Sequence, residues 1–152
     1  MLLLWGGCLY KKILVALDGS EYSERALDKA INLAKAFNSQ IILLNVIKTE
    51  ELELVKQYSE SSYALVKSHL EQTAEKLLVE AEKKAKKKGV EDVVKKVAFG
   101  DPAEKIVDEA NNENVDLIAI GTRGLTGVKR VVLGSTTQKV MRWSDKDVLV
   151  VH

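Results

Sequence analysis

Short runs of consecutive apolar residues alternate along this chain with longer stretches in which apolar residues recur at helical spacing. Residues 13–17, 41–44 and 117–120 are apolar at every position. A strand of this kind must be covered on both faces, as in a parallel sheet flanked by helices, because a strand with one wet face alternates apolar and polar residues. Strands are predicted over residues 12–18, 40–46, 93–99, 115–121 and 147–151.

The first two intervening stretches have the features of amphipathic helices. Ser20 is placed to cap the first helix, whose apolar positions fall on one face. A second helix is predicted over residues 63–88, because its last turn is rich in lysine and Gly89 follows it. The apolar residues that define these two faces are Ala26, Leu27, Ala30, Ile31, Ala34 and Phe37, and then Leu65, Leu70, Leu77, Leu78 and Ala81.

Two later helices have recognisable starts. Asp101, Pro102 and Glu104 form a capping box with proline at the first helical position. Ser135 is predicted to cap the last helix. Residues 50–62 have no clear period and are expected to form an irregular, partly helical connection.

Strands that alternate with helices predict a three-layer, doubly wound α/β fold with right-handed crossovers. Residues 11–152 are expected to form one domain, with residues 1–10 as an apolar extension. In such sheets ligands bind at the carboxyl ends of the strands, where the winding reverses direction. The residues that follow each strand are therefore the candidates for function.

Composition excludes several classes of function. The chain has 152 residues, with 23 Lys and Arg against 22 Asp and Glu, so no excess of cations favours a nucleic acid. One cysteine and two histidines allow neither an intrachain disulfide nor a zinc site of those ligands, and a cytoplasmic location is expected. The apolar residues 1–10 are about half of the ~20 that a membrane span needs, so no membrane partner is expected.

Two strand ends carry residues suited to binding phosphate. The first strand is followed by Asp18, Gly19 and Ser20, and the fourth by a glycine-rich loop over residues 121–137 that contains no acid. Glycines let the backbone approach a ligand, and free amides at a helix N-terminus favour phosphate. The glycines are Gly121, Gly124 and Gly134, the helix N-terminus has Ser135, Thr136 and Thr137, and the cations of the loop are Arg123, Lys129 and Arg130.

Neither common nucleotide motif is present. Gly121, Gly124 and Gly127 are each three residues apart, which fits neither the Walker loop nor the dinucleotide fingerprint. Instead, Gly121-x-x-Gly124, nine residues and then Gly134-Ser135 resembles the ATP-binding signature of the universal stress protein family. Residues 11–20, 43–46, 100–103 and 148–151 are also similar to segments of that family, in its order.

This resemblance implies the strand order 3-2-1-4-5 of the adenine-nucleotide alpha-hydrolase-like fold and a site for ATP, with AMP and ADP as alternatives. Asp18 would accept from the ribose or help to hold Mg²⁺, and Val46 would contact the adenine. A phosphate role for Arg123 is inferred from its charge alone. The resemblance departs from the family at Asn45, where many relatives have histidine, and at Thr136, where an apolar residue is common. With Arg123 included, the candidate ligand residues are Ala16, Asp18, Val46, Ile120, Gly121, Arg123, Gly124, Gly134, Ser135 and Thr136.

The expected function is that of an ATP-binding switch or signalling dimer in a stress response. Its dimer would form through residues 147–151, and ATP would order residues 122–134 for an unknown protein partner. A slow ATP hydrolase and an ATP-independent interaction module are the alternatives. No catalytic residue is predicted, because the loop offers no base near a terminal phosphate.

Overall fold

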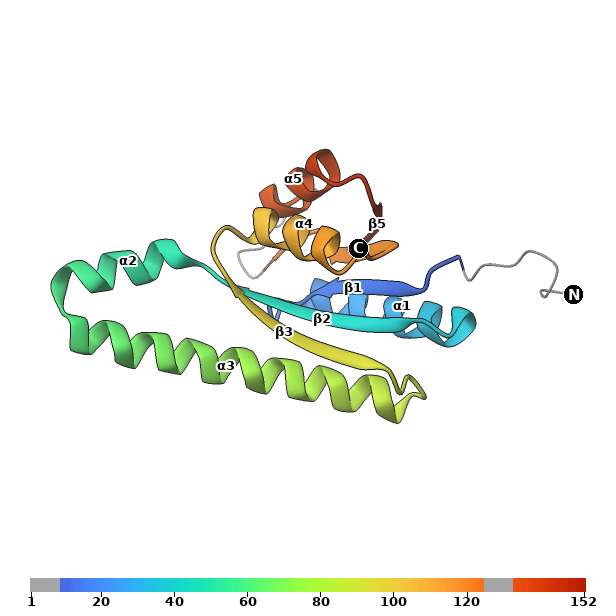
Figure 1. Cartoon of the computed structure of the whole chain (residues 1–152), viewed down its shortest axis with the longest axis horizontal. Coiled ribbons are helices and arrows are strands. Elements are labelled where there is room, and N and C mark those ends of the chain that lie inside the picture. The colour runs from blue at the N-terminus through green and yellow to red at the C-terminus, as the bar shows by residue number, and fades with distance from the viewer. Residues whose placement is uncertain (1–8, 125–132) are drawn as a thin grey trace, which may run out of the picture.

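The computed structural model describes residues 9–124 and 133–152. Within these ranges, parallel strands form a five-stranded sheet in the order β3-β2-β1-β4-β5 (Figure 1). This arrangement confirms the predicted fold class and strand order. The strands are β1 (Lys12–Ala16), β2 (Gln40–Ile47), β3 (Val93–Phe99), β4 (Leu117–Gly121) and β5 (Asp147–Val151).

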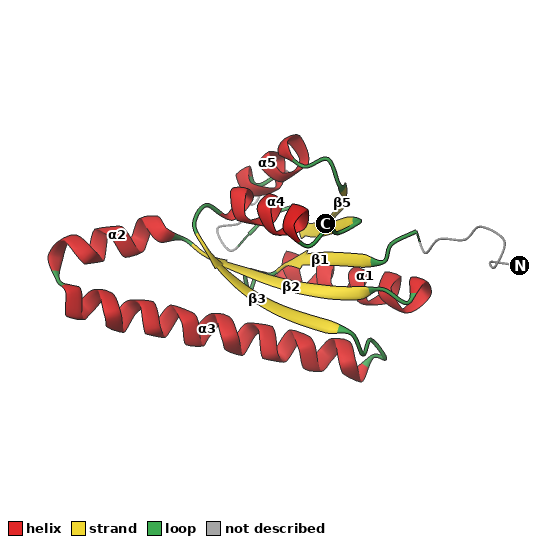
Figure 2. Ribbon diagram, viewed as in Figure 1, coloured by secondary structure: helices red, strands yellow, loops and turns green. Residues whose placement is uncertain are grey.

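Helices cover both faces of the sheet (Figure 2). Helices α1 (Glu21–Phe37) and α3 (Glu60–Lys87) pack on one face, whereas α4 (Pro102–Asn112) and α5 (Ser135–Trp143) pack on the other. Along β1, Ile13 and Val15 face α1 and α3, and Leu14 faces α4 and α5; all three side chains are fully buried. Burial on both faces explains why the strand is apolar at consecutive positions.

Helix α1 begins and ends where its sequence signals predict. The Ser20 hydroxyl accepts a hydrogen bond from the Ser23 amide at 3.1 Å, which satisfies one of the free donors of the first turn. Asn38 ends the helix in the left-handed region, with φ of 55°. Because Ser20 follows β1 so closely, the first turn of α1 lies at the carboxyl end of the sheet.

The connection after β2 differs from the prediction. Most of residues 50–62 are helical, in α2 (Thr49–Tyr58) and in the first turn of α3, whose start is capped by Ser59. Figure 1 shows this helical hairpin projecting beyond the sheet. A helix outside the core needs no buried stripe. Accordingly only Leu52 of α2 is buried, and Leu65, expected on the buried face of α3, is 73% exposed.

The predicted N-cap of α4 is confirmed, whereas the predicted N-cap of α5 is wrong by one residue. The Asp101 side chain accepts from the Glu104 amide at 3.1 Å, as the capping box predicts. In contrast, Gly134 caps α5 and Ser135 is its first helical residue. The Gly134 amide donates to the Thr122 carbonyl at 2.7 Å, which fixes the chain one residue before the predicted cap.

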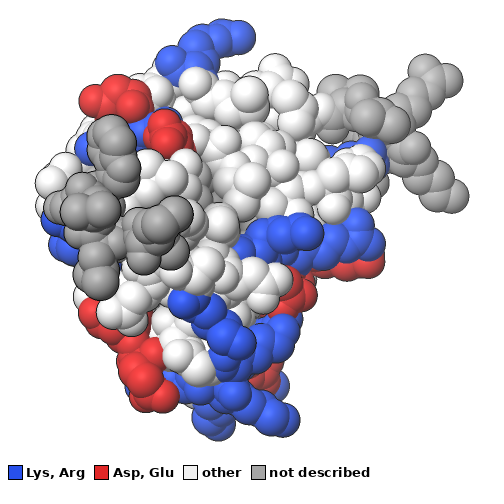
Figure 3. Space-filling view, turned by 90° about the vertical axis from the view of Figure 1, so that its right-hand side faces the viewer, with Lys and Arg blue, Asp and Glu red and all other residues white. Residues whose placement is uncertain are grey.

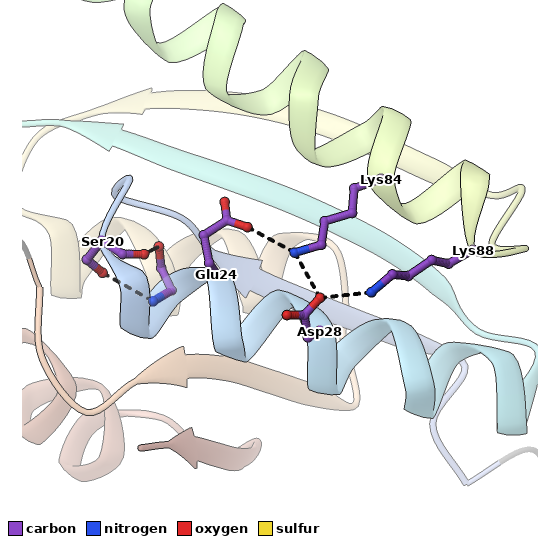
Figure 4. A network of polar contacts seen from close by, with 6 residues as sticks. Ser20, Glu24, Asp28, Lys84 and Lys88 are labelled. Carbon is purple, nitrogen blue, oxygen red and sulfur yellow. Dashed lines mark hydrogen bonds and ion pairs between the residues drawn. The ribbon is translucent and has the colours of Figure 1, made fainter.

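Ion pairs hold α1 against α3 (Figure 4). The Lys84 ammonium lies 3.1 Å from the Glu24 carboxylate and 2.8 Å from that of Asp28, which Lys88 also approaches at 3.2 Å. Hydrogen bonding to Asp28 raises the pKa of Lys84. Burial raises the pKa of Asp28, but the hydrogen bonds from Lys84 and Lys88 outweigh it and hold that pKa below its usual 3.8.

The surface carries charges of both signs, and Lys and Arg lie among Asp and Glu on the face in Figure 3. No helix within residues 9–124 and 133–152 is both long and apolar enough to cross a membrane.

Candidate functional site

The ends of β1 and β4 meet at one edge of the sheet. The two strands pair in parallel, with Leu14 opposite Ile118, so the residues that follow them are neighbours. A Cβ atom built on Gly124 would lie 2.6 Å from the Asp18 Oδ2 atom. The loop after β4 therefore lies directly against the carboxylate after β1, as expected for strands on either side of a winding reversal.

The turn after β1 holds Asp18 in place. Its Oδ1 atom accepts a hydrogen bond from the Ser20 amide at 2.9 Å, and Gly19 permits the turn with φ of +84°. Asn45 reaches across from β2 and donates from Nδ2 to the Leu17 carbonyl at 2.7 Å. The exposed Asp18 thus uses one oxygen within its own turn, while the other faces Gly124.

An apolar wall lies beside these polar groups. Ala16, Val46 and Ile120 are at the carboxyl ends of β1, β2 and β4, and all three pack into the cluster on the α4 and α5 face. Ile120 is buried, whereas Ala16 and Val46 are half-buried. The structure therefore places Val46, the predicted adenine contact, in the same apolar cluster as the predicted ligand residues Ala16 and Ile120.

Backbone hydrogen bonds join the end of β4 to β5 and to α5. The Thr122 amide donates to the Val151 carbonyl at 2.8 Å, and the Thr122 carbonyl accepts from Gly134. Thr137 is buried, and its hydroxyl donates to the Gly121 carbonyl at 2.7 Å. The Thr137 hydroxyl thus has a structural role rather than the expected phosphate-binding one.

The start of α5 keeps groups suited to an anion. Ser135 is exposed and Thr136 is half-buried at the first two helical positions. The first amides of a helix have no partner within it, so they can donate to a phosphate. Gly134 lies just before them, and its Cβ position is 3.4 Å from the Thr122 carbonyl oxygen.

Arg123 is held in a way that the sequence did not indicate. Its guanidinium lies over the ring of Tyr22 in α1, 5.4 Å from the ring centroid, and its Nε atom is shielded from solvent. Tyr22 also lies against Gly121, whose Cβ position is 2.8 Å from the Tyr22 carbonyl carbon. Neither contact corresponds to a sequence motif, so the role of Tyr22 could not be predicted from the sequence.

Part of the predicted site lies outside the described residues. Lys129 and Arg130 belong to residues 125–132, as does most of the segment that ATP was expected to order. In the part of the chain that the structure describes, no three His, Cys, Asp or Glu side chains come together as a metal site. Asp18 is the single acid that the sequence assigned to Mg²⁺.

The sheet order defines a doubly wound α/β protein, and the candidate site at the ends of β1 and β4 lies at its switch point, where such sheets commonly bind ligands. The family can be stated more closely, because the model of the universal stress protein family matches residues 9–152. The chain belongs to the universal stress protein family.

Individual relatives agree with this assignment. Universal stress protein YxiE of Bacillus subtilis is 34% identical over 149 residues, which cover 95% of this chain and 100% of YxiE. The structure of hypothetical protein MJ0577 superposes with a TM-score of 0.83 at 34% identity, over 94% of this chain and 96% of that one. A universal stress protein in complex with cAMP gives a TM-score of 0.67 at 30% identity, over 94% and 97% of the two chains.

Proposed function

We propose that this protein binds ATP between β1 and β4 and acts as a nucleotide-dependent switch in a stress response. The observation that carries the proposal is the contact of Gly124 with the Asp18 carboxylate, because it joins the glycine signature to the end of β1. ADP and AMP have the same adenosine part and are the alternative ligands. The relative in complex with cAMP supports a ligand of the adenine nucleotide class.

Each part of the nucleotide has a matching group on the protein. The apolar wall of Ala16, Val46 and Ile120 suits the adenine ring, and the free oxygen of Asp18 suits a ribose hydroxyl. The amides at the start of α5 suit the phosphates, which the helix dipole also favours. These groups extend from β2 to α5, so the nucleotide would lie across the carboxyl ends of the strands.

Mg²⁺ would accompany the phosphates rather than occupy a site of its own. This ion commonly binds through one or two carboxylates together with phosphate oxygens and waters. Asp18 fits this pattern as the single carboxylate at the crevice among the residues assigned to the site. Removing Mg²⁺ with EDTA should therefore weaken ATP binding in the wild type and have little effect in Asp18→Asn.

Calorimetric titration with ATP, ADP, AMP and cAMP tests the proposal. The wild type should bind ATP, and Gly124→Val should lose binding, because its side chain would displace the Asp18 carboxylate. Ala36→Val also introduces a valine, on the exposed side of α1, and should bind normally. Equal ATP affinity in the wild type and Gly124→Val would reject this site, and steady phosphate release would identify the slow hydrolase instead.

We further propose that the protein dimerises through the edge of β5. Residues 147–151 include four consecutive apolar residues at an edge of the sheet, and an open edge can pair with another chain. The opposite edge is protected by charge. On β3, Lys95 pairs with Glu75 at 3.3 Å and Lys96 pairs with Glu109 at 3.1 Å, and charged residues on an edge strand oppose pairing.

Nucleotide binding would reach this dimer edge through Thr122. Its amide is bonded to the end of β5, and it lies between Gly121 and Gly124 of the signature. ATP should therefore slow hydrogen exchange at the Thr122 and Gly134 amides. Unchanged exchange of these amides at saturating ATP would contradict the switch. The protein would then bind ATP without transmitting a change to the dimer edge. A stable dimer that binds no nucleotide would support the ATP-independent interaction module.

A further inference from the structure

Tyr22 in α1 contacts the described part of the signature, at Gly121 and Arg123, in two different ways. The Arg123 guanidinium lies 5.4 Å from its ring centroid, and Gly121 lies against its backbone. The ring of His152, which follows β5, is 6.2 Å away at a tilt of 45°. One side chain in the first turn of α1 thus contacts both the loop after β4 and the end of β5.

The Tyr22 ring also has a cation contact within its own helix. Arg25 lies over the same ring, 5.5 Å from its centroid, and forms an ion pair with Glu21 one turn earlier. The Ser20 cap anchors this turn of the helix. These contacts are all local to the start of α1, so the ring can be held by its own helix as well as by Arg123.

We infer that Tyr22 is a positioning residue for the nucleotide site, holding Arg123 by a cation–π contact and so fixing the loop from Gly121 to Gly124. The inference rests on the proposed nucleotide site. Arg123 then acts on the ligand through the shape of the loop rather than by a direct bond to phosphate. A guanidinium on an aromatic ring keeps its neighbours ordered, and replacing such a contact changes an equilibrium by about two- to thirty-fold.

Two substitutions separate the ring from the hydroxyl. Tyr22→Phe keeps the ring, and Tyr22→Leu removes it while keeping the Cβ atom that lies against Gly121. Tyr63→Leu is the matched control, because Tyr63 in α3 also has a cation over its ring, Lys56 at 5.7 Å, on an element away from the loop. ATP affinity should fall about five-fold in Tyr22→Leu and less than about two-fold in the other two variants.

A double-mutant cycle tests whether Tyr22 acts through Arg123. If it does, Arg123→Met should weaken ATP binding in the wild type and have no further effect in Tyr22→Leu. Wild-type ATP affinity in Tyr22→Leu, equal losses in Tyr22→Phe and Tyr22→Leu, or fully additive effects would each overturn the inference.

A measurement without ligand keeps the inference separate from the proposed function. The NMR signal of the Arg123 Nε–H group, identified by its loss in Arg123→Met, should carry a ring-current shift. That shift should persist in Tyr22→Phe and Tyr63→Leu and disappear in Tyr22→Leu. If the wild type binds no nucleotide, the proposed function fails while this signal still decides the contact. If the Arg123 Nε–H signal has the same chemical shift in Tyr22→Leu as in the wild type, the inferred contact is wrong.

Discussion

Gly121 and Gly134 are both glycines of the signature, but their surroundings differ. A Cβ atom on Gly121 would lie 2.7 Å from the Tyr22 Cβ and 3.0 Å from its carbonyl oxygen, whereas on Gly134 the nearest atom would be 3.4 Å away. Gly121→Ala should therefore lower the free energy of unfolding by about 2 kcal/mol, since α1 must shift. Gly134→Ala should cost less, about 0.5–1 kcal/mol, because no atom clashes but alanine is a poorer N-cap of α5 than glycine.

Urea denaturation of both variants measures this difference. Equal stability of the two variants would contradict the expected displacement of α1 by a side chain at position 121.

The Thr137 hydroxyl supplies a second prediction for single residues. It is buried and donates to the Gly121 carbonyl, so Thr137→Val should leave that acceptor without its partner and cost about 1–3 kcal/mol. Thr73→Val is the control, because Thr73 makes a similar bond to the His69 carbonyl on an exposed part of α3. Thermal unfolding should show a clearly larger loss for Thr137→Val, and equal losses would contradict the role given to this bond.

Some residues of the candidate site could be predicted from the sequence, and others could not. Asp18 and Gly124 could be predicted because both belong to recognisable segments after strands, and the strand order brings them together. Tyr22 and Thr137 could not, because their roles depend on contacts between separate elements. The charge of Arg123 suggested a phosphate ligand, but a charge does not say which neighbour will hold it; the structure places it on an aromatic ring.

The layer of α1 and α3 is held by charge as well as by apolar packing, which makes its stability depend on pH. The pKa of Asp28 is lowered in the folded protein, so its contribution is present above its usual 3.8 and lost as the pH falls through the lower folded value. Its side chain is 43% exposed, and solvent screening limits the contribution to about 0.5 kcal/mol.

Asp28→Asn should therefore reduce the free energy of unfolding at neutral pH, with a difference from the wild type that shrinks toward zero in acid. Asp108→Asn is the control, because its pair with Lys105 is longer, at 3.8 Å, and Asp108 is 58% exposed. Denaturation series over pH measure both. A difference for Asp28→Asn that grows in acid would contradict the lowered pKa.

Elements were predictable where they face the core. Helix α1 begins at its predicted cap and buries its predicted stripe, because burial on one face imposes a period on the sequence. Helix α2 and the start of α3 extend past the sheet, where little constrains which positions are apolar. That freedom explains why residues 50–62 had no period and why Leu65 is exposed.

The two edge strands of the sheet should respond in opposite ways to a new charge. Val148 on β5 and Val94 on β3 are both half-buried and pack toward the α4 and α5 face. Val148→Lys should dissociate the proposed dimer, because a symmetric interface receives two new charges. Val94→Lys places the same charge at the other edge and should leave the dimer intact. Sedimentation velocity distinguishes these outcomes, and dissociation by both or neither would rule out β5 as the interface.

The charged pairs at Lys95 and Lys96 also limit how large an assembly can become. A sheet in which both edge strands can pair with other chains can grow into an unlimited polymer. If β3 cannot pair, the proposed dimer joined through β5 has only its two β3 strands at the outer edges of the sheet. Growth would therefore stop at the dimer. The lysines of β3 would thus limit the proposed assembly to two chains and prevent growth into fibres.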